Sequence, residues 1–207
     1  MNKVLGIQYD KLEYKVQARK KLAQFYQKTT GRVSIPEDKQ YWTLCALQTK
    51  NATSEINQLS KLGLITKEQF NGVDRSEEII KANRKVHPGA SWYFGEWDTV
   101  LRRNSKKFNP AIVHLDFTSM AMTQAVINTV LQTMSLCELD TFVFVNVMLN
   151  NPRDPRVRFK KGDFIEKLYR TTYNEFIDKW KFFNQATLYC ATGWTRMATY
   201  PFRKIKI

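Results

Sequence analysis

Acidic residues follow three short apolar segments of the sequence, each at the point where the segment ends. Asp74 follows FNGV, Glu96 and Asp98 lie in the GEWD that follows SWYF, and Asp116 follows AIVHL. A carboxylate can accept two hydrogen bonds from a vicinal diol, bind Mg²⁺ or take a proton from a reacting group. The pattern predicts a binding or catalytic site, provided that the fold brings these segment ends together.

Two of these acids also have a simpler structural interpretation. Asp116 precedes a helix expected over about 119–134, and Asp74 precedes a helix expected over 76–83. An Asp at a helix N-cap accepts a hydrogen bond from a free backbone N–H of the first turn. Both interpretations remain open from the sequence alone.

The surrounding chain alternates between strand and helix patterns. Runs of apolar and aromatic residues predict strands at 41–47, 70–73, 91–94, 111–115, 141–149, 186–192 and 197–207. Helical spacing of apolar residues predicts helices at about 10–30, 54–62, 75–84, 119–134 and 164–183, with a short basic helix after Asp98. Thr53 or Ser54 is expected to cap the second helix, and Gly63 to end it.

This alternation predicts crossover connections and a mostly parallel sheet. The segment TFVFVNVML at 141–149 is almost entirely apolar, which indicates a strand covered by helices on both faces. The last two strands flank Gly193 and predict an antiparallel pair. We therefore expect an α/β fold of three layers, with a seven-stranded, mostly parallel sheet over 38–207. A basic N-terminal helix and connector precede it over 1–37.

The net charge suggests an anionic partner. The 207 residues include 33 Lys and Arg against 19 Asp and Glu, a formal charge of +14. Such a charge bears on partners and solubility rather than on fold, and it favours DNA or RNA. An acidic protein partner, a homo-oligomer and a purely solubilising role remain alternatives.

Basic residues concentrate in the N-terminal helix and in the loop NNPRDPRVRFKKGD, which is expected to leave the same sheet edge as Asp116. Candidate phosphate contacts in that loop are Arg153, Arg156, Arg158, Lys160 and Lys161. The helix carries Lys11, Lys15, Arg19, Lys20, Lys21 and Lys28. Base stacking is expected from Tyr41, Trp42, Trp92 and Trp194 if they are exposed. The alternative is a solvated charge run with buried aromatic residues.

Cysteine and hydropathy patterns argue against a metal centre, a secretory signal and a membrane span. Cys45, Cys137 and Cys190 lack the spacing of a zinc or CxxC motif, and only two histidines accompany them, so we expect packed thiols and no metal site. The first residues are not a signal peptide, and there is no apolar run of about 18 residues. The expected location is intracellular and soluble, in the cytoplasm, nucleoid or nucleus.

The order of elements and the placement of the acids resemble the class I S-adenosylmethionine-dependent methyltransferases over about residues 38–207. The resemblance implies that Asp74 binds the ribose hydroxyls of the cofactor, that GEWD flanks its adenine, and that Asp116 lies beside its methionine part and the methyl acceptor. The implied cofactor contacts are Leu44, Cys45, Ala46, Gln48, Asp74, Gly95, Glu96, Trp97, Asp116 and Phe117.

Two family features are absent. The first loop, ALQTKNATSE, contains no glycine, although Ala46, Ala52, Thr53 and Ser54 are small enough to allow a close approach of the backbone. The segment LDFTS offers an acid and an aromatic residue. It lacks the pair of prolines typical of enzymes that methylate the exocyclic amines of bases, and the nucleophilic cysteine of enzymes that methylate C5 of cytosine. The following helix, 119–134, contains no lysine, whereas enzymes that methylate the ribose 2′-hydroxyl use a Lys-Asp-Lys-Glu set.

Three functions remain in view. The first is an S-adenosylmethionine-dependent methyltransferase acting on nucleic acid, in which Asp116 orients the acceptor or acts as a base. The second is an inactive protein of the same fold that binds nucleic acid or a partner subunit. The third is a Mg²⁺-dependent nuclease that uses Asp74, Asp116 and either Glu96 or Glu55.

Overall fold

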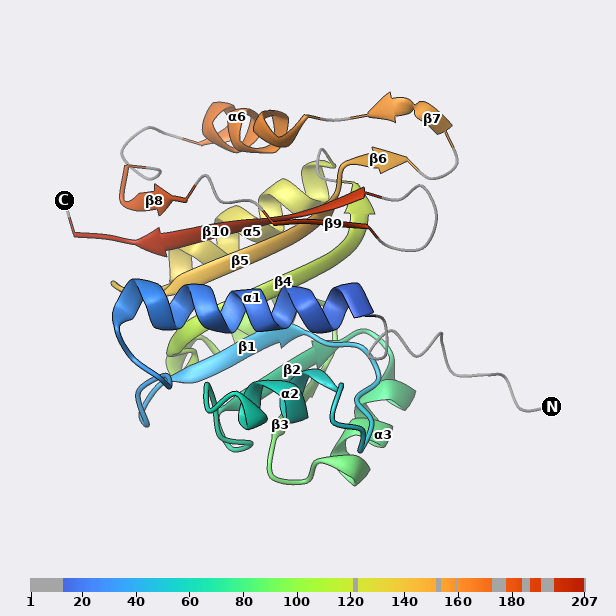
Figure 1. Cartoon of the computed structure of the whole chain (residues 1–207), viewed down its shortest axis with the longest axis vertical. Coiled ribbons are helices and arrows are strands. Elements are labelled where there is room, and N and C mark those ends of the chain that lie inside the picture. The colour runs from blue at the N-terminus through green and yellow to red at the C-terminus, as the bar shows by residue number, and fades with distance from the viewer. Residues whose placement is uncertain are drawn as a thin grey trace. The chain divides into compact units, whose positions relative to one another are not determined.

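The structure is a computed structural model that describes residues 13–120, 123–151, 154–158, 160–172, 178–183, 187–190 and 196–206. The described residues form two compact units. Unit 1 ends at Arg103, and unit 2 begins at Asn104. In Figure 1 unit 1 is coloured from blue to green, and unit 2 continues from there to red.

Unit 1 alternates helices with parallel strands. Its elements are α1 (Glu13–Thr30), β1 (Gln40–Leu44), α2 (Glu55–Lys61), β2 (Phe70–Asp74), α3 (Glu77–Val86), β3 (Ser91–Phe94) and α4 (Trp97–Arg103). β2 lies between β1 and β3 and pairs with both in parallel. The carboxyl ends of the three strands therefore meet at one edge, as the alternating pattern predicted.

Gly72 allows an aromatic ring to lie against the middle of β2. A Cβ atom at this position would lie 2.6 Å from the ring of Trp92, its neighbour on β3, and 3.0 Å from the sulfur of Cys45. The indole of Trp92 donates a hydrogen bond to the His87 carbonyl at 3.0 Å. Only glycine leaves room for this arrangement, so the packing of α3 against the sheet depends on residue 72.

Buried aromatic residues form part of the core of unit 1. Tyr41, Trp42 and Trp92 are buried, and Trp42 stacks on Tyr93 with ring centroids 5.0 Å apart. Base stacking was expected of these residues only if they are exposed, so the alternative of buried aromatic residues holds for these three. Trp194, the fourth candidate, lies outside the described residues.

Helix α1 is attached to α2 by polar contacts. Gln58 donates to the Val16 carbonyl at 2.6 Å, and buried Arg19 donates to the Thr53 carbonyl at 3.0 Å. Arg19 also lies 3.8 Å from the carboxylate of Glu55. These contacts of Arg19 therefore lie inside unit 1. The predicted domain boundary near residue 37 stays a prediction.

The other lysines expected on this helix differ in exposure. Lys20, Lys21 and Lys28 are exposed, and Lys15 is partly buried. Lys11 lies outside the described residues. The exposed lysines remain free to meet an anionic partner, as the sequence suggested.

Unit 2 combines a parallel pair of strands with antiparallel ones. Its elements are a short 3₁₀ helix (Ser105–Lys107), β4 (Pro110–Met120), α5 (Gln124–Leu136), β5 (Phe142–Met148), β6 (Asn150–Asn151), β7 (Asp154–Arg158), α6 (Lys161–Thr171), β8 (Trp180–Phe182), β9 (Thr187–Cys190) and β10 (Arg196–Lys204). β4 and β5 are parallel, and β10 runs antiparallel to β5, β8 and β9. β6 and β7 form a separate antiparallel pair.

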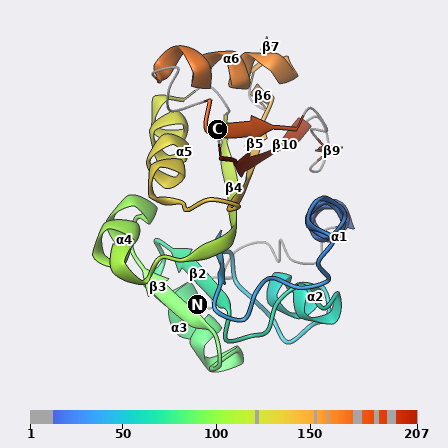
Figure 2. The same cartoon turned by 90° about the vertical axis from the view of Figure 1, so that its left-hand side faces the viewer.

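The β5 strand is buried along nearly all of its length. Phe142 to Val147 are buried, as the apolar segment TFVFVNVML predicted. α5 lies along one side of β4 and β5 and contacts α6 (Figure 2). The predicted α/β class and the antiparallel pair at the end of the chain are therefore confirmed.

Two regions of unit 2 differ from the predictions. The helix expected over 164–183 ends at Thr171, and β8 follows it as a strand against β10. The basic loop contains β6 and β7 instead of irregular chain. Short strands of this kind are fixed by pairing with a partner strand, which a local sequence pattern does not reveal.

None of the helices in the described part of the chain combines the length and apolar composition that a membrane span requires.

Candidate functional site

Asp74 ends β2 and is half-buried. Its Oδ1 accepts a hydrogen bond from the backbone N–H of Ser76 at 2.7 Å. Ser76 is itself the N-cap of α3, and its hydroxyl accepts from the N–H of Ile79 at 3.3 Å. The capping role is therefore filled by Ser76, which leaves Asp74 available at the strand end.

The environment of Asp74 changes its acidity. Burial raises the pKa of Asp74 above the usual 3.8, and the hydrogen bond from the Ser76 N–H partly offsets this effect. The carboxylate therefore gains from any ligand that donates hydrogen bonds to its charged form. The two hydroxyls of a ribose are donors of this kind.

Phe94 lies beside Asp74 and was missed by the sequence analysis. It ends β3, pairs in register with Asp74, and is 54% exposed. Paired residues on neighbouring strands point to the same face of a sheet, so an exposed ring accompanies the carboxylate. The signal was the final aromatic residue of SWYF, but its exposure only follows from the register.

The GEWD segment continues from Phe94. Gly95 has a φ of 140°, which favours glycine, and its N–H donates to the Asp74 carbonyl at 3.0 Å. Trp97 is buried and meets Trp42 edge-on at 6.4 Å, so its ring packs in the core rather than offering an exposed face. Glu96 is exposed and lies 3.8 Å from Arg75.

Asp98 carries a carboxylate oxygen that has no hydrogen-bond partner among the described residues. It lies in the first turn of α4, and its Oδ1 is buried without a hydrogen bond among the described residues. A buried acceptor left unpaired costs free energy, which a ligand that donates to it would recover. Asp98 therefore adds an acceptor to the strand ends that carry Asp74 and Phe94.

The glycine-free loop after β1 is shaped by side-chain amides. Asn83 of α3 is fully buried; it accepts from the N–H of Gln48 at 2.7 Å and donates to the Ala46 carbonyl at 3.1 Å. The Oε1 of Gln48 in turn accepts from the N–H of Ile56 at 3.4 Å. Loop and helices are joined here by bonds to the backbone, not by glycine turns.

Two further side chains tie the end of this loop. Asn57 donates to the Lys50 carbonyl at 3.2 Å and the Asn51 carbonyl at 2.9 Å. The Nε2 of His87 lies 3.0 Å from the Thr49 carbonyl, and burial lowers the pKa of His87. A neutral ring with its proton on Nε2 donates this bond, so the loop is closed from α3 as well.

The predicted cofactor residues of this region separate into two groups. Cys45 and Gln48 are buried, and the thiol of Cys45 donates to the Val73 carbonyl at 3.5 Å. Leu44 and Ala46 remain partly exposed at the end of β1. Contact with a ligand is therefore expected from the partly exposed residues, whereas the buried ones hold the loop.

In unit 2, Asp116 lies within β4 rather than at its end. β4 continues to Met120, and its register against β5 shifts between these two residues. α5 begins at Gln124, where Thr123 is the N-cap and its hydroxyl accepts from the N–H of Val126 at 3.4 Å. The helix predicted from Ser119 is therefore displaced, and Asp116 does not cap it.

Asp116 instead belongs to a polar cluster between β4 and β5. Its Oδ1 lies 3.3 Å from the Nδ2 of Asn146, which also lies 2.8 Å from the Nε2 of His114. Asn146 and His114 are buried, and Asp116 and the neighbouring Phe117 are partly exposed. Asn146 was overlooked, although an amide inside the apolar run FVFVNVM was a visible signal.

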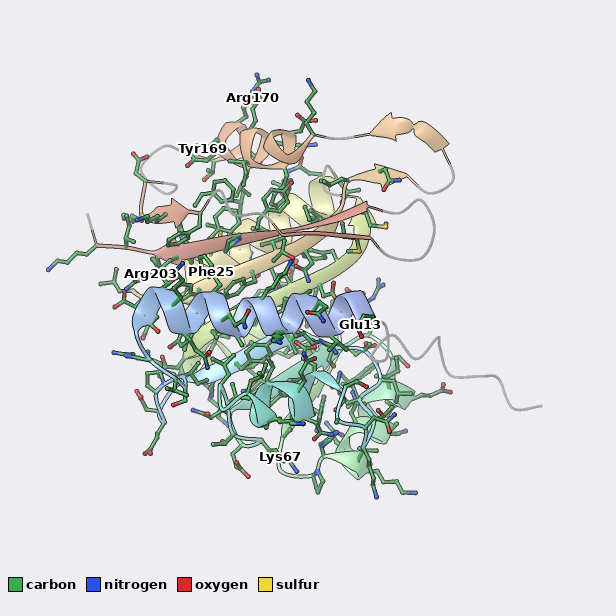
Figure 3. The ribbon with its side chains drawn as sticks, viewed as in Figure 1. Glu13, Phe25, Lys67, Tyr169, Arg170 and Arg203 are labelled. Carbon is green, nitrogen blue, oxygen red and sulfur yellow. The ribbon has the colours of Figure 1, made fainter. Side chains whose placement is uncertain are left out.

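The basic residues near α6 are only partly placed. Arg156 and Arg158 lie on β7, and Lys161 begins α6, but their side chains and all of Arg153 lie outside the described residues. Lys160 is exposed at the N-cap of α6. Figure 3 shows Tyr169 and Arg170 projecting from the same helix.

Among the described residues there is no ligand cluster for the Mg²⁺ alternative. Buried Glu55 accepts from the Tyr41 hydroxyl at 2.6 Å and from the Thr43 hydroxyl at 3.2 Å, so its carboxylate is engaged inside unit 1. Within the described ranges, no three His, Cys, Asp or Glu side chains gather in a way that could hold a metal ion.

No protein-family model and no curated protein matches this sequence. Solved structures do match. The plantazolicin methyltransferase BamL, in a complex that contains S-adenosylhomocysteine, gives a TM-score of 0.60 at 11% identity over 93% of this chain and 85% of BamL. An rRNA methylase from Streptococcus thermophilus gives 0.51 at 9% identity over 92% of this chain and 95% of that chain.

A third similar structure is TrmN from Thermus thermophilus, with a TM-score of 0.55 at 11% identity over 92% of this chain. This chain spans only 48% of the length of TrmN. Identities this low establish a shared fold and leave the reaction and substrate to other arguments. The chain has the Rossmann-like α/β fold of the class I S-adenosylmethionine-dependent methyltransferases.

Proposed function

We propose that this chain is an S-adenosylmethionine-dependent methyltransferase that acts on nucleic acid. The observation that carries the proposal is Asp74, a half-buried carboxylate at the end of β2 that is free of the capping role. The residues proposed for the cofactor belong to unit 1, and Asp116 is the residue proposed to bind the methyl acceptor.

The residues of unit 1 suit each part of the cofactor. Asp74 can accept from both ribose hydroxyls, the exposed ring of Phe94 offers a surface for adenine, and the unpaired Oδ1 of Asp98 can accept from its amino group. Leu44 and Ala46 are partly exposed at the end of β1. When bound, the cofactor supplies the methyl group for transfer.

Nucleic acid is proposed as the substrate because of the charge and exposed basic residues. The sequence carries +14, and exposed basic residues occur in both units: Lys20, Lys21, Lys28, Arg102, Arg103, Lys106, Lys107 and Lys160. Basic side chains bind phosphates and fix the register of a nucleic acid without reading its sequence. One structure of the same fold is that of an rRNA methylase.

A second candidate is an inactive protein of the same fold. The loop after β1 favours it, because its backbone is fastened by Asn83, Asn57 and His87 instead of being shaped by glycines. The two candidates differ in one property, which is binding of the cofactor by unit 1.

Calorimetric titration with S-adenosylhomocysteine separates the two candidates. The methyltransferase proposal predicts binding by the unmodified chain and a loss of about 10- to 100-fold in affinity for Asp74→Ala, because two bonds to a charged acceptor are removed. Glu77→Ala is the matched control, since Glu77 is an exposed acid of α3 paired with Lys81. No binding, or equal binding by Asp74→Ala, contradicts the proposal.

Nucleic-acid binding is tested by its dependence on salt. The affinity for RNA and for DNA is expected to fall steeply between about 50 and 200 mM salt, because phosphate contacts release counterions. An affinity that does not change with salt would exclude phosphate contacts as its main source.

A further inference from the structure

Three polar residues occupy neighbouring positions on three strands of unit 2. Asp116 of β4 pairs in register with Asn146 of β5, and Asn146 pairs in register with Thr199 of β10. Residues paired in register point to the same face of a sheet. We call Asp116, Asn146 and Thr199 the polar row. Its central residue, Asn146, lies two residues before the end of β5.

The amide of Asn146 is fixed in one orientation. Its Nδ2 lies 2.8 Å from the Nε2 of His114 and 3.3 Å from the Oδ1 of Asp116, so both amide protons have acceptors. The opposite orientation would place the amide oxygen against the Asp116 carboxylate, which offers only acceptors when ionised. In this orientation the Nε2 of His114 is the acceptor of the second amide proton.

This orientation leaves two polar atoms of the row unpaired. The Oδ1 of Asn146 and the Oγ1 of Thr199 are both buried without a hydrogen bond in the part of the chain that the structure describes. The hydroxyl of Thr199 can rotate toward a new partner, whereas the amide oxygen cannot move without breaking the two bonds of Nδ2. Two unpaired atoms beside a carboxylate form a pattern of hydrogen-bonding groups that a ligand can complete.

The polar row presents two fixed acceptors, the Asp116 carboxylate and the Asn146 amide oxygen, followed by the Thr199 hydroxyl. A primary amino group donates two hydrogen bonds, to acceptors about 5 Å apart, which is close to the spacing of neighbouring strands. A hydroxyl group has one proton and would leave one acceptor unpaired. The Thr199 hydroxyl can donate to an unprotonated nitrogen next to such an amino group.

We propose that the polar row recognises an amino group beside an unprotonated ring nitrogen, as on adenine or cytosine, and that this exocyclic amine is the methyl acceptor. The inference rests on the proposed function and names its substrate. Guanine differs because its amino group lies between a protonated ring nitrogen, N1, and an unprotonated one, N3, which faces the attached sugar. Uracil and hypoxanthine have no amino group.

The transfer balances with the groups named. The amine nitrogen forms the new N–C bond as the S–C bond of the cofactor sulfonium breaks, and S-adenosylhomocysteine leaves as a neutral thioether. The methylated nitrogen then gives up one proton, which Asp116 can accept and pass to solvent. Asn146 is a positioning residue for Asp116 as well as an acceptor for the second N–H of the amine.

Homopolymers test the substrate directly. With tritiated S-adenosylmethionine, poly(A) or poly(C), as RNA or DNA, should be labelled at least about 100-fold faster than poly(G), poly(I) or poly(U). Equal labelling of poly(I) or poly(U), or preference for poly(G), overturns the inference. If no polymer is labelled although S-adenosylhomocysteine binds, the inference falls while cofactor binding stands. If S-adenosylhomocysteine does not bind, the proposed function falls, and the inference with it.

Variants separate recognition from folding. Asn146→Ala should lower kcat about 100-fold while the affinity for S-adenosylhomocysteine is unchanged. Thr199→Val should keep activity on poly(A) or poly(C) but reduce its preference over poly(G) by about 10-fold. The matched control is Ser60→Ala, which removes another buried, unpaired hydroxyl, located in unit 1. Equal effects of the control and Thr199→Val overturn the inference.

A binding measurement gives a readout that does not depend on turnover. In a ¹⁵N-labelled protein, the side-chain amide signals of Asn146, identified by their loss in Asn146→Ala, should shift on addition of oligo(dA) or oligo(dC) and not of oligo(dT). The same shift with all three oligonucleotides, or with none, contradicts recognition of the amine by this residue.

Discussion

The loop after β1 in unit 1 and the polar row in unit 2 use the same kinds of side chain in opposite ways. In the loop, Asn83 uses its amide nitrogen and oxygen on backbone partners. In the polar row, Asn146 has partners for its nitrogen, and its oxygen has none within the described ranges. Satisfied amides fix a backbone, whereas an unsatisfied one beside a carboxylate leaves a place for a ligand.

The two proposed carboxylates extend this contrast. Asp74 accepts from a backbone N–H two residues later, so its position follows from a local turn. Asp116 accepts from a side chain on another strand, so its position follows from the sheet. The position of Asp74 therefore depends on residues next to it in the sequence, whereas that of Asp116 depends on the pairing of β4 with β5.

The largest expected effect belongs to Asp116. Replacing it by Ala should lower the rate of methyl transfer at least about 100-fold, because the carboxylate that takes the proton from the methylated amine is removed. The affinity for S-adenosylhomocysteine should not change. Rate measurements at saturating substrate, together with calorimetry, give both values. A variant with full activity would show that Asp116 has no part in the chemistry.

The next effect concerns the closed loop of unit 1. Asn83→Ala should lower the free energy of unfolding by about 1–3 kcal/mol, because it strands the N–H of Gln48 and the carbonyl of Ala46. Urea unfolding measures the change. Asn57→Ala is the control, since two of its bonds are exposed and their loss should cost less. An equal or smaller cost for Asn83→Ala contradicts the loop account.

A smaller effect of opposite sign is expected in the polar row. Thr199→Val should leave the free energy of unfolding unchanged or raise it by up to about 1 kcal/mol, because a buried hydroxyl without a partner is replaced by a methyl group of similar size. A loss of more than about 1 kcal/mol in urea unfolding would reveal a structural role for this hydroxyl.

The smallest effect is a dependence on pH. Burial raises the pKa of Asp74, so on acidification the carboxylate takes up a proton above the usual 3.8 and loses acceptor capacity. As the pH is lowered from neutrality, the affinity for S-adenosylhomocysteine should therefore begin to fall while the pH is still above 3.8. The same shift makes the contribution of Asp74 to folding stability decline as pH rises from 3.8 through its folded-state pKa.

Calorimetry from about pH 7 to about pH 4 measures this loss of affinity. Asp74→Asn provides the control, because an amide does not titrate in this range. If both proteins show the same pH dependence, Asp74 is not its source.

The sequence predicted those parts of the molecule that depend on local pattern. The strand ending at Asp74 and the apolar strand β5 were recognised from residue type and spacing. The aromatic segment SWYF was also placed correctly as β3. The sequence did not show which aromatic ring near Asp74 is exposed. Trp97 of the GEWD segment was therefore predicted to contact the cofactor, and Phe94 was not.

The errors share a physical cause. β4 runs past Asp116 because Met120 pairs with β5, and β8 exists because β10 offers it a partner. Pairing between distant segments overrides local propensity. For the same reason the polar row escaped notice, since its three residues are 30 or more positions apart and meet only through strand register.

The most direct test of the central claim is a crystal structure of the chain with S-adenosylhomocysteine. The account predicts a ligand whose two ribose hydroxyls both lie within about 3 Å of the Asp74 carboxylate, with its adenine against Phe94. A ligand bound elsewhere, or none at saturating concentration, would contradict it.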